Sequence, residues 1–193
     1  IGIAKILPKG ILNWNYMSAP EPYAAGTVVS HPRGKVLGGS SSINLMAYVR
    51  GHKRDYDNWR QKGLNGWSYD DVLPYFKRSE NFEKGGNEYH GDSGPLHVQA
   101  PHPKDTLFNM LLEAGKSGGY PHTADYNGAE QEGFTRLQYT TKNGKRCSAA
   151  VAYLHPVAGR DNLTVITDAL VTRIVIEHGR ARSVEYEKDG ETH

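Results

Sequence analysis

The spacing of apolar residues along the chain predicts three longer helices. Residues 55–63 and 68–82 have helical spacing, with Gly63 ending the first helix and Ser68 capping the second. A third helix is predicted over residues 105–119, ending in a glycine cap. Two apolar faces follow from this spacing: Val72, Leu73, Tyr75 and Phe76 in the second helix, and Leu107, Phe108, Leu111, Leu112 and Ala114 in the third. The glycines of the predicted cap are Gly115, Gly118 and Gly119.

Other stretches predict strands and shorter helices. Residues 94–100 form a strand candidate with Leu96 and Val98 on one face. The alternation over residues 162–190 predicts three strands with a tight turn at His178-Gly179, and a last turn at Asp189-Gly190 with no return strand. Residues 148–156 predict a short helix capped by Ser148. Residues 41–49 predict a helix that begins in a run of serines.

Composition narrows the class of protein. The chain has 193 residues, 37% hydrophobic and 23% charged, with a net charge of +2. These values fit a globular domain and predict neither a nucleic-acid nor a membrane partner. The single cysteine, Cys147, excludes an internal disulfide framework. Because the chain begins with Ile1 and ends just past a hairpin turn, we expect it to be an interior section of a longer protein.

The stretch RGKVLGGSSSIN, residues 33–44, is the strongest candidate for chemistry. Gly38 and Gly39 have no side chain to keep an anion from the backbone, and Ser40–Ser42 add hydroxyl donors. Composition alone leaves two interpretations open, a plain flexible loop and a phosphate-binding loop.

Most other chemical motifs are missing. A P-loop requires a glycine where Met110 stands before Gly115-Lys116-Ser117, and no GxGxxG or GxSxG pattern occurs. The nine histidines form no metal-ligand pair, and one cysteine cannot support a Cys/His zinc site. Asp70 and Asp71 lie at a predicted helix start, where they stabilise the helix dipole, rather than forming an acid/base pair.

The residues from Gly34 to Asp57, GKVLGGSSSINLMAYVRGHKRDYD, resemble the first signature of the glucose–methanol–choline (GMC) oxidoreductases, which depend on FAD. The resemblance extends through NGWSYDDVLPYFKRSEN, GDSGPLHV, NGAEQEGF, AYLHP and NLTVITDALVTRIVIE, and covers in effect the whole chain. It is closest to the alcohol- and choline-dehydrogenase-like branch.

The resemblance implies an α/β plus α+β fold. Part of a doubly wound FAD-binding domain would be combined with part of an antiparallel-sheet substrate domain. Residues 1–83 would belong to the FAD-binding domain, 84–160 would begin the substrate domain, and 161–193 would return to the FAD-binding domain. The family's GxGxxG loop and its catalytic histidine would lie outside this chain, so it would contribute no catalytic residue and would be inactive alone.

The resemblance also implies site residues. Gly38, Gly39 and Ser40 would line the pyrophosphate and ribityl region of FAD. Asn44, Leu45, Met46 and Ala47 would approach the flavin, largely through backbone atoms, and Val171 would recognise the adenine edge. Some members attach the flavin through a histidine that stands where this chain has Ile43, so we expect non-covalent FAD.

The implied reaction is oxidation of a small alcohol, with hydride transfer to the flavin. The specific alcohol, the electron acceptor and the oligomeric state are left open. Two alternatives also stay open: a lyase that keeps FAD for structure only, and a phosphate-binding module without flavin. The module would fold alone, whereas an interior fragment would be poorly stable because its strands lack partners.

Overall fold

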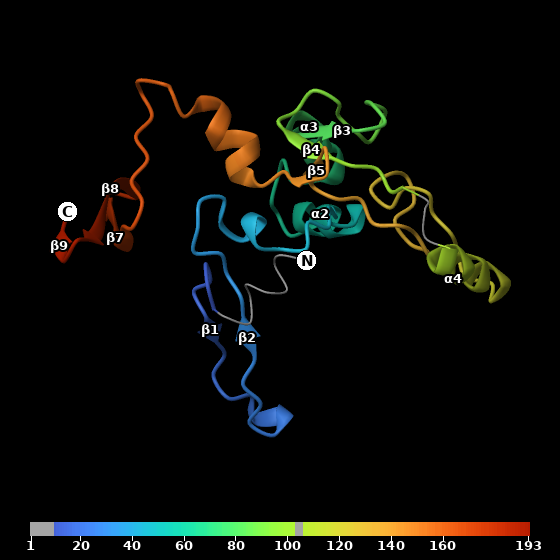
Figure 1. Ribbon diagram of the computed structural model, residues 1–193, viewed down its shortest axis with the longest axis horizontal. Helices are drawn as coiled ribbons and strands as arrows, with labels where there is room; N and C mark the ends of the chain where they lie inside the picture. The colour runs from blue at the N-terminus through green and yellow to red at the C-terminus, as the bar shows by residue number, and fades with distance from the viewer. Residues whose placement is uncertain (1–9, 103–105) are drawn as a thin grey trace. The chain divides into compact units, whose positions relative to one another are not determined.

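The computed structural model describes residues 10–102 and 106–193, which form two compact units. The first unit extends to Pro156, and the second comprises residues 157–193 (Figure 1). The predicted domain boundaries at residues 83 and 160 stay predictions.

Two capped helices form the helical part of the first unit. Helix α2, Lys53–Gln61, begins two residues before the predicted start because His52 Nδ1 accepts a hydrogen bond from Arg54 N–H, at 3.1 Å. Helix α3, Tyr69–Ser79, begins at the predicted Ser68 cap, and the Asp71 carboxylate accepts from Ser68 N–H at 3.0 Å. Asp71 therefore serves the helix start, as predicted.

The apolar faces predicted for the long helices are only partly buried. In α3 only Val72 is buried, while Tyr75 is 62% exposed beneath the guanidinium of Arg78. In helix α4, Thr106–Ser117, the buried residue is Gly115, which packs against the ring of Phe134. Gly115 therefore packs against Phe134, and its C=O also accepts a hydrogen bond from Tyr120 N–H at 3.0 Å, so it takes part in the predicted cap.

Gly119 takes the left-handed conformation, with φ of 79°, at the end of α4, and Gly118 N–H donates to Ala114 C=O. Gly119 N–H also donates to Lys116 C=O at 3.0 Å, and together with the C=O of Gly115 these two glycines form the predicted cap. Asp105, at the predicted start of this helix, lies outside the described residues.

A small parallel sheet carries the hydrophobic core. Strand β3, Glu80–Phe82, pairs in parallel with β4, Leu96–Val98, which confirms the predicted strand in this region. Phe82, Val98 and Ala100 are buried together, with Tyr48 packed against them.

The predicted helix over residues 41–49 is wrong. A 3₁₀ turn, η3, covers Gly39–Ser42, and the backbone then continues without regular structure. Met46 has a φ of 65°, which an α-helix does not permit, and Asn44 Oδ1 accepts from Met46 N–H at 3.0 Å. This local side-chain bond competes with helical backbone bonding.

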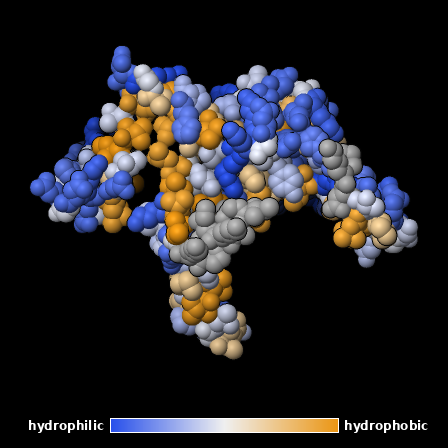
Figure 2. Space-filling view, in the orientation of Figure 1, coloured by the Kyte–Doolittle hydropathy of each residue, from blue (hydrophilic) through white to orange (hydrophobic). Residues whose placement is uncertain are grey.

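Four further short strands belong to the first unit. Strands β1, Tyr16–Met17, and β2, Ser30–His31, form an antiparallel hairpin around the 3₁₀ turn η2, Pro22–Ala24. Apolar side chains of this hairpin are exposed to solvent, as Figure 2 shows at the projecting end of the unit. Strands β5, Thr141–Lys142, and β6, Lys145–Arg146, form a second hairpin.

Ser148 caps the next helical segment as predicted, because its Oγ accepts from Val151 N–H at 3.3 Å. The segment itself is a π-helix, η4, Ala150–Leu154, followed by the 3₁₀ turn η5, His155–Val157.

The second unit is an antiparallel sheet of β7, Leu170–Glu177, β8, Arg180–Lys188, and β9, Glu191–Thr192. His178-Gly179 forms the predicted turn. Two predictions are wrong. Residues 163–165 form no strand, and a return strand does follow Asp189-Gly190, because both residues adopt positive φ and direct β9 back onto β8.

Within the described ranges, no helix is both long and apolar enough to cross a bilayer.

The approach of Gly94 to the end of α3 gives a test of the core. A Cβ at Gly94 would lie 2.3 Å from the Ser79 carbonyl carbon and 2.4 Å from Glu80 N. Gly94→Ala is expected to lower the free energy of unfolding of the native protein by about 1–3 kcal/mol, because backbone atoms must move. Gly159→Ala is the control, since a Cβ there meets no atom within 4 Å. Urea denaturation measures both variants, and equal stabilities would contradict this packing.

Candidate functional site

Residues 38–47, here called the bed segment, begin with two glycines and the 3₁₀ turn η3. Gly38 and Gly39 have φ of 86° and 55°, values that favour glycine. A Cβ at Gly38 would lie 2.5 Å from Ser42 Oγ, so this glycine is required by packing. A Cβ at Gly39 would meet no atom within 4 Å, so the space beside Gly39 is open.

The serine hydroxyls of the bed segment stabilise the turn itself. Ser41 Oγ donates to Gly38 C=O at 2.6 Å, and Ser42 Oγ donates to Leu37 C=O at 2.8 Å. Ser40 Oγ accepts from Gly34 N–H at 3.1 Å. The protons of Ser41 and Ser42 are therefore used within the chain, and these two residues are not the anion donors that the sequence suggested.

The second half of the bed segment exposes its backbone. Asn44, Leu45 and Ala47 are exposed, whereas the side chain of Ile43 is buried. Within the described ranges, Leu45 N–H and Ala47 N–H donate to no acceptor. The segment thus presents unpaired backbone donors beside an open glycine surface, and such groups bind negatively charged or carbonyl oxygens.

Three residues that the sequence did not indicate hold this segment in place. Arg146 donates to Ser41 C=O at 2.9 Å and to Asn44 Oδ1 and C=O, both at 2.8 Å. Thr140 N–H donates to Met46 C=O at 2.8 Å, and Ala149 N–H donates to Ser41 Oγ at 2.8 Å. These contacts join positions about a hundred residues apart, and no local pattern indicates them.

A buried charged network lies just beyond the bed segment, starting at Arg50. The guanidinium of Arg50 bonds the Glu80 carboxylate at 2.8 Å and Tyr89 C=O at 2.7 Å. His90 lies between Glu80 and Asp125, with Nδ1 3.0 Å from Glu80 Oε2 and Nε2 2.8 Å from Asp125 Oδ2. Among the residues that the structure describes, no buried side-chain nitrogen or oxygen lacks a partner.

The surroundings of His90 set its charge. Burial alone lowers the pKa of His90, but its hydrogen bonds to Asp125 and Glu80 outweigh burial and raise that pKa to about 8. For Asp125, burial raises the pKa, and the bond to His90 more than reverses this, so the pKa lies below its usual value. With His90 protonated, two cations, Arg50 and His90, balance two carboxylates, Glu80 and Asp125.

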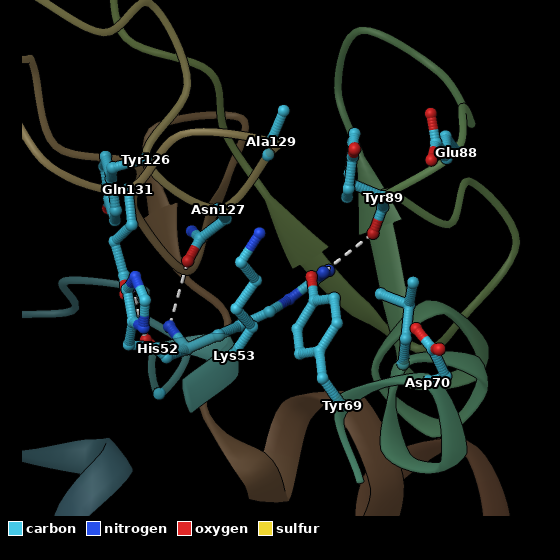
Figure 3. Close-up of a pocket in the computed structure, with 14 residues that line it drawn as sticks. His52, Lys53, Tyr69, Asp70, Glu88, Tyr89, Tyr126, Asn127, Ala129 and Gln131 are labelled. Atoms are coloured by element: carbon cyan, nitrogen blue, oxygen red, sulfur yellow. Dashed lines mark hydrogen bonds between the residues drawn. The ribbon is translucent and has the colours of Figure 1, made fainter. Parts of the chain in front are cut away.

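A pocket of about 220 Å³ opens beside Arg50 (Figure 3). The start of α2 provides His52 and Lys53, the start of α3 provides Tyr69 and Asp70, and residues 126–131 line another side. Some of its polar groups are bonded within the protein: Arg50 N–H donates to Asn127 Oδ1, and Gln131 Nε2 donates to Arg50 C=O. Across residues 10–102 and 106–193, no cluster of histidine, cysteine or acidic side chains is arranged to hold a metal ion.

Comparison with known proteins decides the family. Residues 19–193 match the family model described as GMC oxidoreductase. The chain belongs to the GMC oxidoreductase family. This membership confirms the resemblance seen first in the residues from Gly34 to Asp57, which include the glycine–serine run of Gly38–Ser42.

Relatives and solved structures agree with this assignment. The chain is 52% identical over 178 residues to an oxygen-dependent choline dehydrogenase of Sinorhizobium fredii, a match that covers 92% of this chain and 32% of the relative. It matches pyridoxine 4-oxidase from Mesorbium loti with a TM-score of 0.87 at 34% identity, over 94% of this chain and 36% of that one. An FAD-dependent oxidoreductase from Chaetomium thermophilum matches with a TM-score of 0.86 at 26% identity, over 94% of this chain and 34% of that one.

The chain thus spans about a third of the length of these GMC proteins. The structural matches confirm the mixed helix-and-strand fold class expected from the sequence. Of the expected site residues, Gly38, Gly39, Ser40 and Asn44–Ala47 lie in one continuous segment of the first unit. Val171 is an exposed residue of β7 in the second unit, and its role stays a prediction.

The charge of His90 predicts a pH-dependent stability. Its folded pKa, about 8, exceeds the ordinary value of 6.5, so its stabilisation is fully present below pH 6.5 and is lost as pH rises through 8. The native protein should therefore lose about 2 kcal/mol of unfolding free energy between pH 6 and pH 9 from this group. The variant His90→Gln should lack this loss. Urea denaturation measured from pH 6 to pH 9 tests this prediction. An equal dependence of the unfolding free energy on pH in both proteins would contradict the raised pKa of His90.

Proposed function

We propose that this chain forms the flavin-contacting part of an FAD-dependent oxidoreductase that oxidises the CH–OH group of a small alcohol. The observation that carries the proposal is the bed segment, where open glycine backbone and the unpaired N–H groups of Leu45 and Ala47 occur within the family's signature. Family membership and the FAD-dependent structural relative support FAD as the ligand of this segment.

Each part of the bed segment has a proposed contact. Gly38, Gly39 and Ser40 would line the pyrophosphate and ribityl region, and within the described residues Ser40 is the one of the three serines whose hydroxyl donates no hydrogen bond. Asn44 to Ala47 would hold the flavin ring and ribityl chain through backbone atoms. Val171 would bind the adenine edge from β7.

The attachment is proposed to be non-covalent. Covalent attachment needs a nucleophilic side chain, whereas Ile43 has an aliphatic side chain that is 6% exposed. FAD would therefore be held by hydrogen bonds and packing, and acid denaturation should release it.

Bound flavin supplies the redox chemistry by accepting hydride from the alcohol carbon. The residues of this chain bind and orient the cofactor, and the proposal assigns none of them the role of catalytic base. Choline is the first substrate to test, because relatives near 50% identity are named for it.

The proposed activity has a direct spectroscopic test. The native protein, purified and reconstituted with FAD, should show flavin absorbance that is bleached by choline or another small alcohol without oxygen. A lyase that keeps FAD for structure would show the absorbance without bleaching, and a protein that remains colourless would refute the flavin assignment itself.

The open space beside Gly39 gives a test at residue level. Gly39→Ala should weaken FAD binding about tenfold or more, because the new methyl group enters the proposed cofactor space. Gly63→Ala is the matched control, since Gly63 also has positive φ, 96°, with no atom within 4 Å of its Cβ. Both changes add a methyl group at a glycine with positive φ and open space, and Gly63 lies outside the bed segment. Flavin fluorescence quenching measures both affinities, and equal losses would contradict the placement of FAD at Gly39.

A further inference from the structure

The guanidinium of Arg146 makes three hydrogen bonds to the bed segment. Its Nη1 donates to Ser41 C=O at 2.9 Å and to Asn44 Oδ1 at 2.8 Å, and its Nη2 donates to Asn44 C=O at 2.8 Å. One planar guanidinium thus bonds three oxygens on both sides of Ile43. Hydrogen bonds from a charged donor are stronger than neutral ones, and the rigid fork of arginine fixes the relative orientation of its acceptors.

Asn44 links Arg146 to the backbone that follows it in the chain. Its Oδ1 accepts from Arg146 and also from Met46 N–H, at 3.0 Å. Met46 is held at φ of 65°, a conformation that a residue with a side chain rarely adopts. The bond from Arg146 therefore fixes the side chain that stabilises this turn, between the exposed N–H groups of Leu45 and Ala47.

Arg146 is itself held firmly. It ends the β5–β6 hairpin, whose turn residues Asn143 and Gly144 both have positive φ. The next residue, Cys147, is buried, and its N–H donates to Thr140 C=O at 2.9 Å. Arg146 is half-buried, and this burial lowers the pKa of its guanidinium. The guanidinium is thus fixed against the bed segment by three hydrogen bonds.

We propose that Arg146 is the positioning residue of the flavin site, which holds Asn44 to Ala47 in the conformation that receives the cofactor. The inference rests on the proposed function. It assigns a role in cofactor binding to a residue that lies about a hundred positions from the glycine–serine run. Without Arg146, the two Asn44 oxygens and Ser41 C=O lose their common donor, and the segment gains conformations that must be given up when FAD binds.

The test compares three variants of the native protein. Arg146→Gln removes the charge and the fork. Arg146→Lys keeps the charge but not the fork geometry. Lys145→Gln is the matched control, because it removes one positive charge from the adjacent exposed position, whose side chain makes no hydrogen bond or ion pair within the described residues.

Each variant is stripped of flavin and titrated with FAD, and the visible circular dichroism of the bound flavin is recorded at saturation. Arg146→Gln should weaken FAD binding about tenfold or more and alter the dichroism, Arg146→Lys should fall between it and wild type, and Lys145→Gln should stay within about twofold of wild type. The dichroism at saturation reports the geometry of the site and is not changed by a loss of global stability alone.

Wild-type affinity and dichroism in Arg146→Gln would overturn the proposal, as would an equal loss in Lys145→Gln. If Arg146→Gln does not fold, Arg146→Lys decides. Weakened binding with altered dichroism supports the role of the fork, and wild-type values refute it. Failure of the wild-type protein to bind FAD would refute the proposed function itself, which separates the two conclusions.

Discussion

The ion pair between Arg50 and Glu80 is the interaction on which the first unit depends. Both side chains are almost fully buried, and removal of either partner would leave an unbalanced charge in the interior. Arg50 follows the bed segment by three residues, and Glu80 begins β3, so the pair connects the candidate site to the hydrophobic core. His90 and Asp125 extend it across two further loops. Few alternative arrangements satisfy four such charges at once, so the backbone next to the bed segment is held in one position.

The bed segment uses its side chains for structure and its backbone for contact. Ser41 and Ser42 bond carbonyls within the turn, Ile43 is buried, and Asn44 bonds Arg146 and Met46. The surface of the segment also presents glycine backbone, the exposed side chain of Leu45 and, within the described residues, the unpaired N–H groups of Leu45 and Ala47. This division suits a large planar cofactor, which can lie against backbone where side chains would keep it away. Positions fixed in advance also reduce the entropy lost when the ligand binds.

The sequence predicted the features that depend on neighbouring residues. Ser68 and Ser148 cap helices as expected, Gly63 ends one, and His178-Gly179 forms a turn, because each acts on backbone a few residues away. The predicted helix over 41–49 is wrong both because Asn44 Oδ1 accepts from Met46 N–H and because residues about 100 positions later hold this segment. Asn44 and Met46 are held by Arg146 and Thr140, and apolar periodicity contains no information on such contacts. The role of Arg146 and the buried network around His90 required the structure for the same reason.

The proposed function requires the backbone of residues 38–47 to be part of the surface that receives FAD. Amide hydrogen exchange of the native protein, measured by mass spectrometry with and without FAD, tests it most directly. Peptides containing Leu45 and Ala47 should become strongly protected when FAD is added, while peptides from the β1–β2 turn around Tyr23 should exchange as before. Unchanged exchange of residues 38–47 in protein that is saturated with FAD would contradict it.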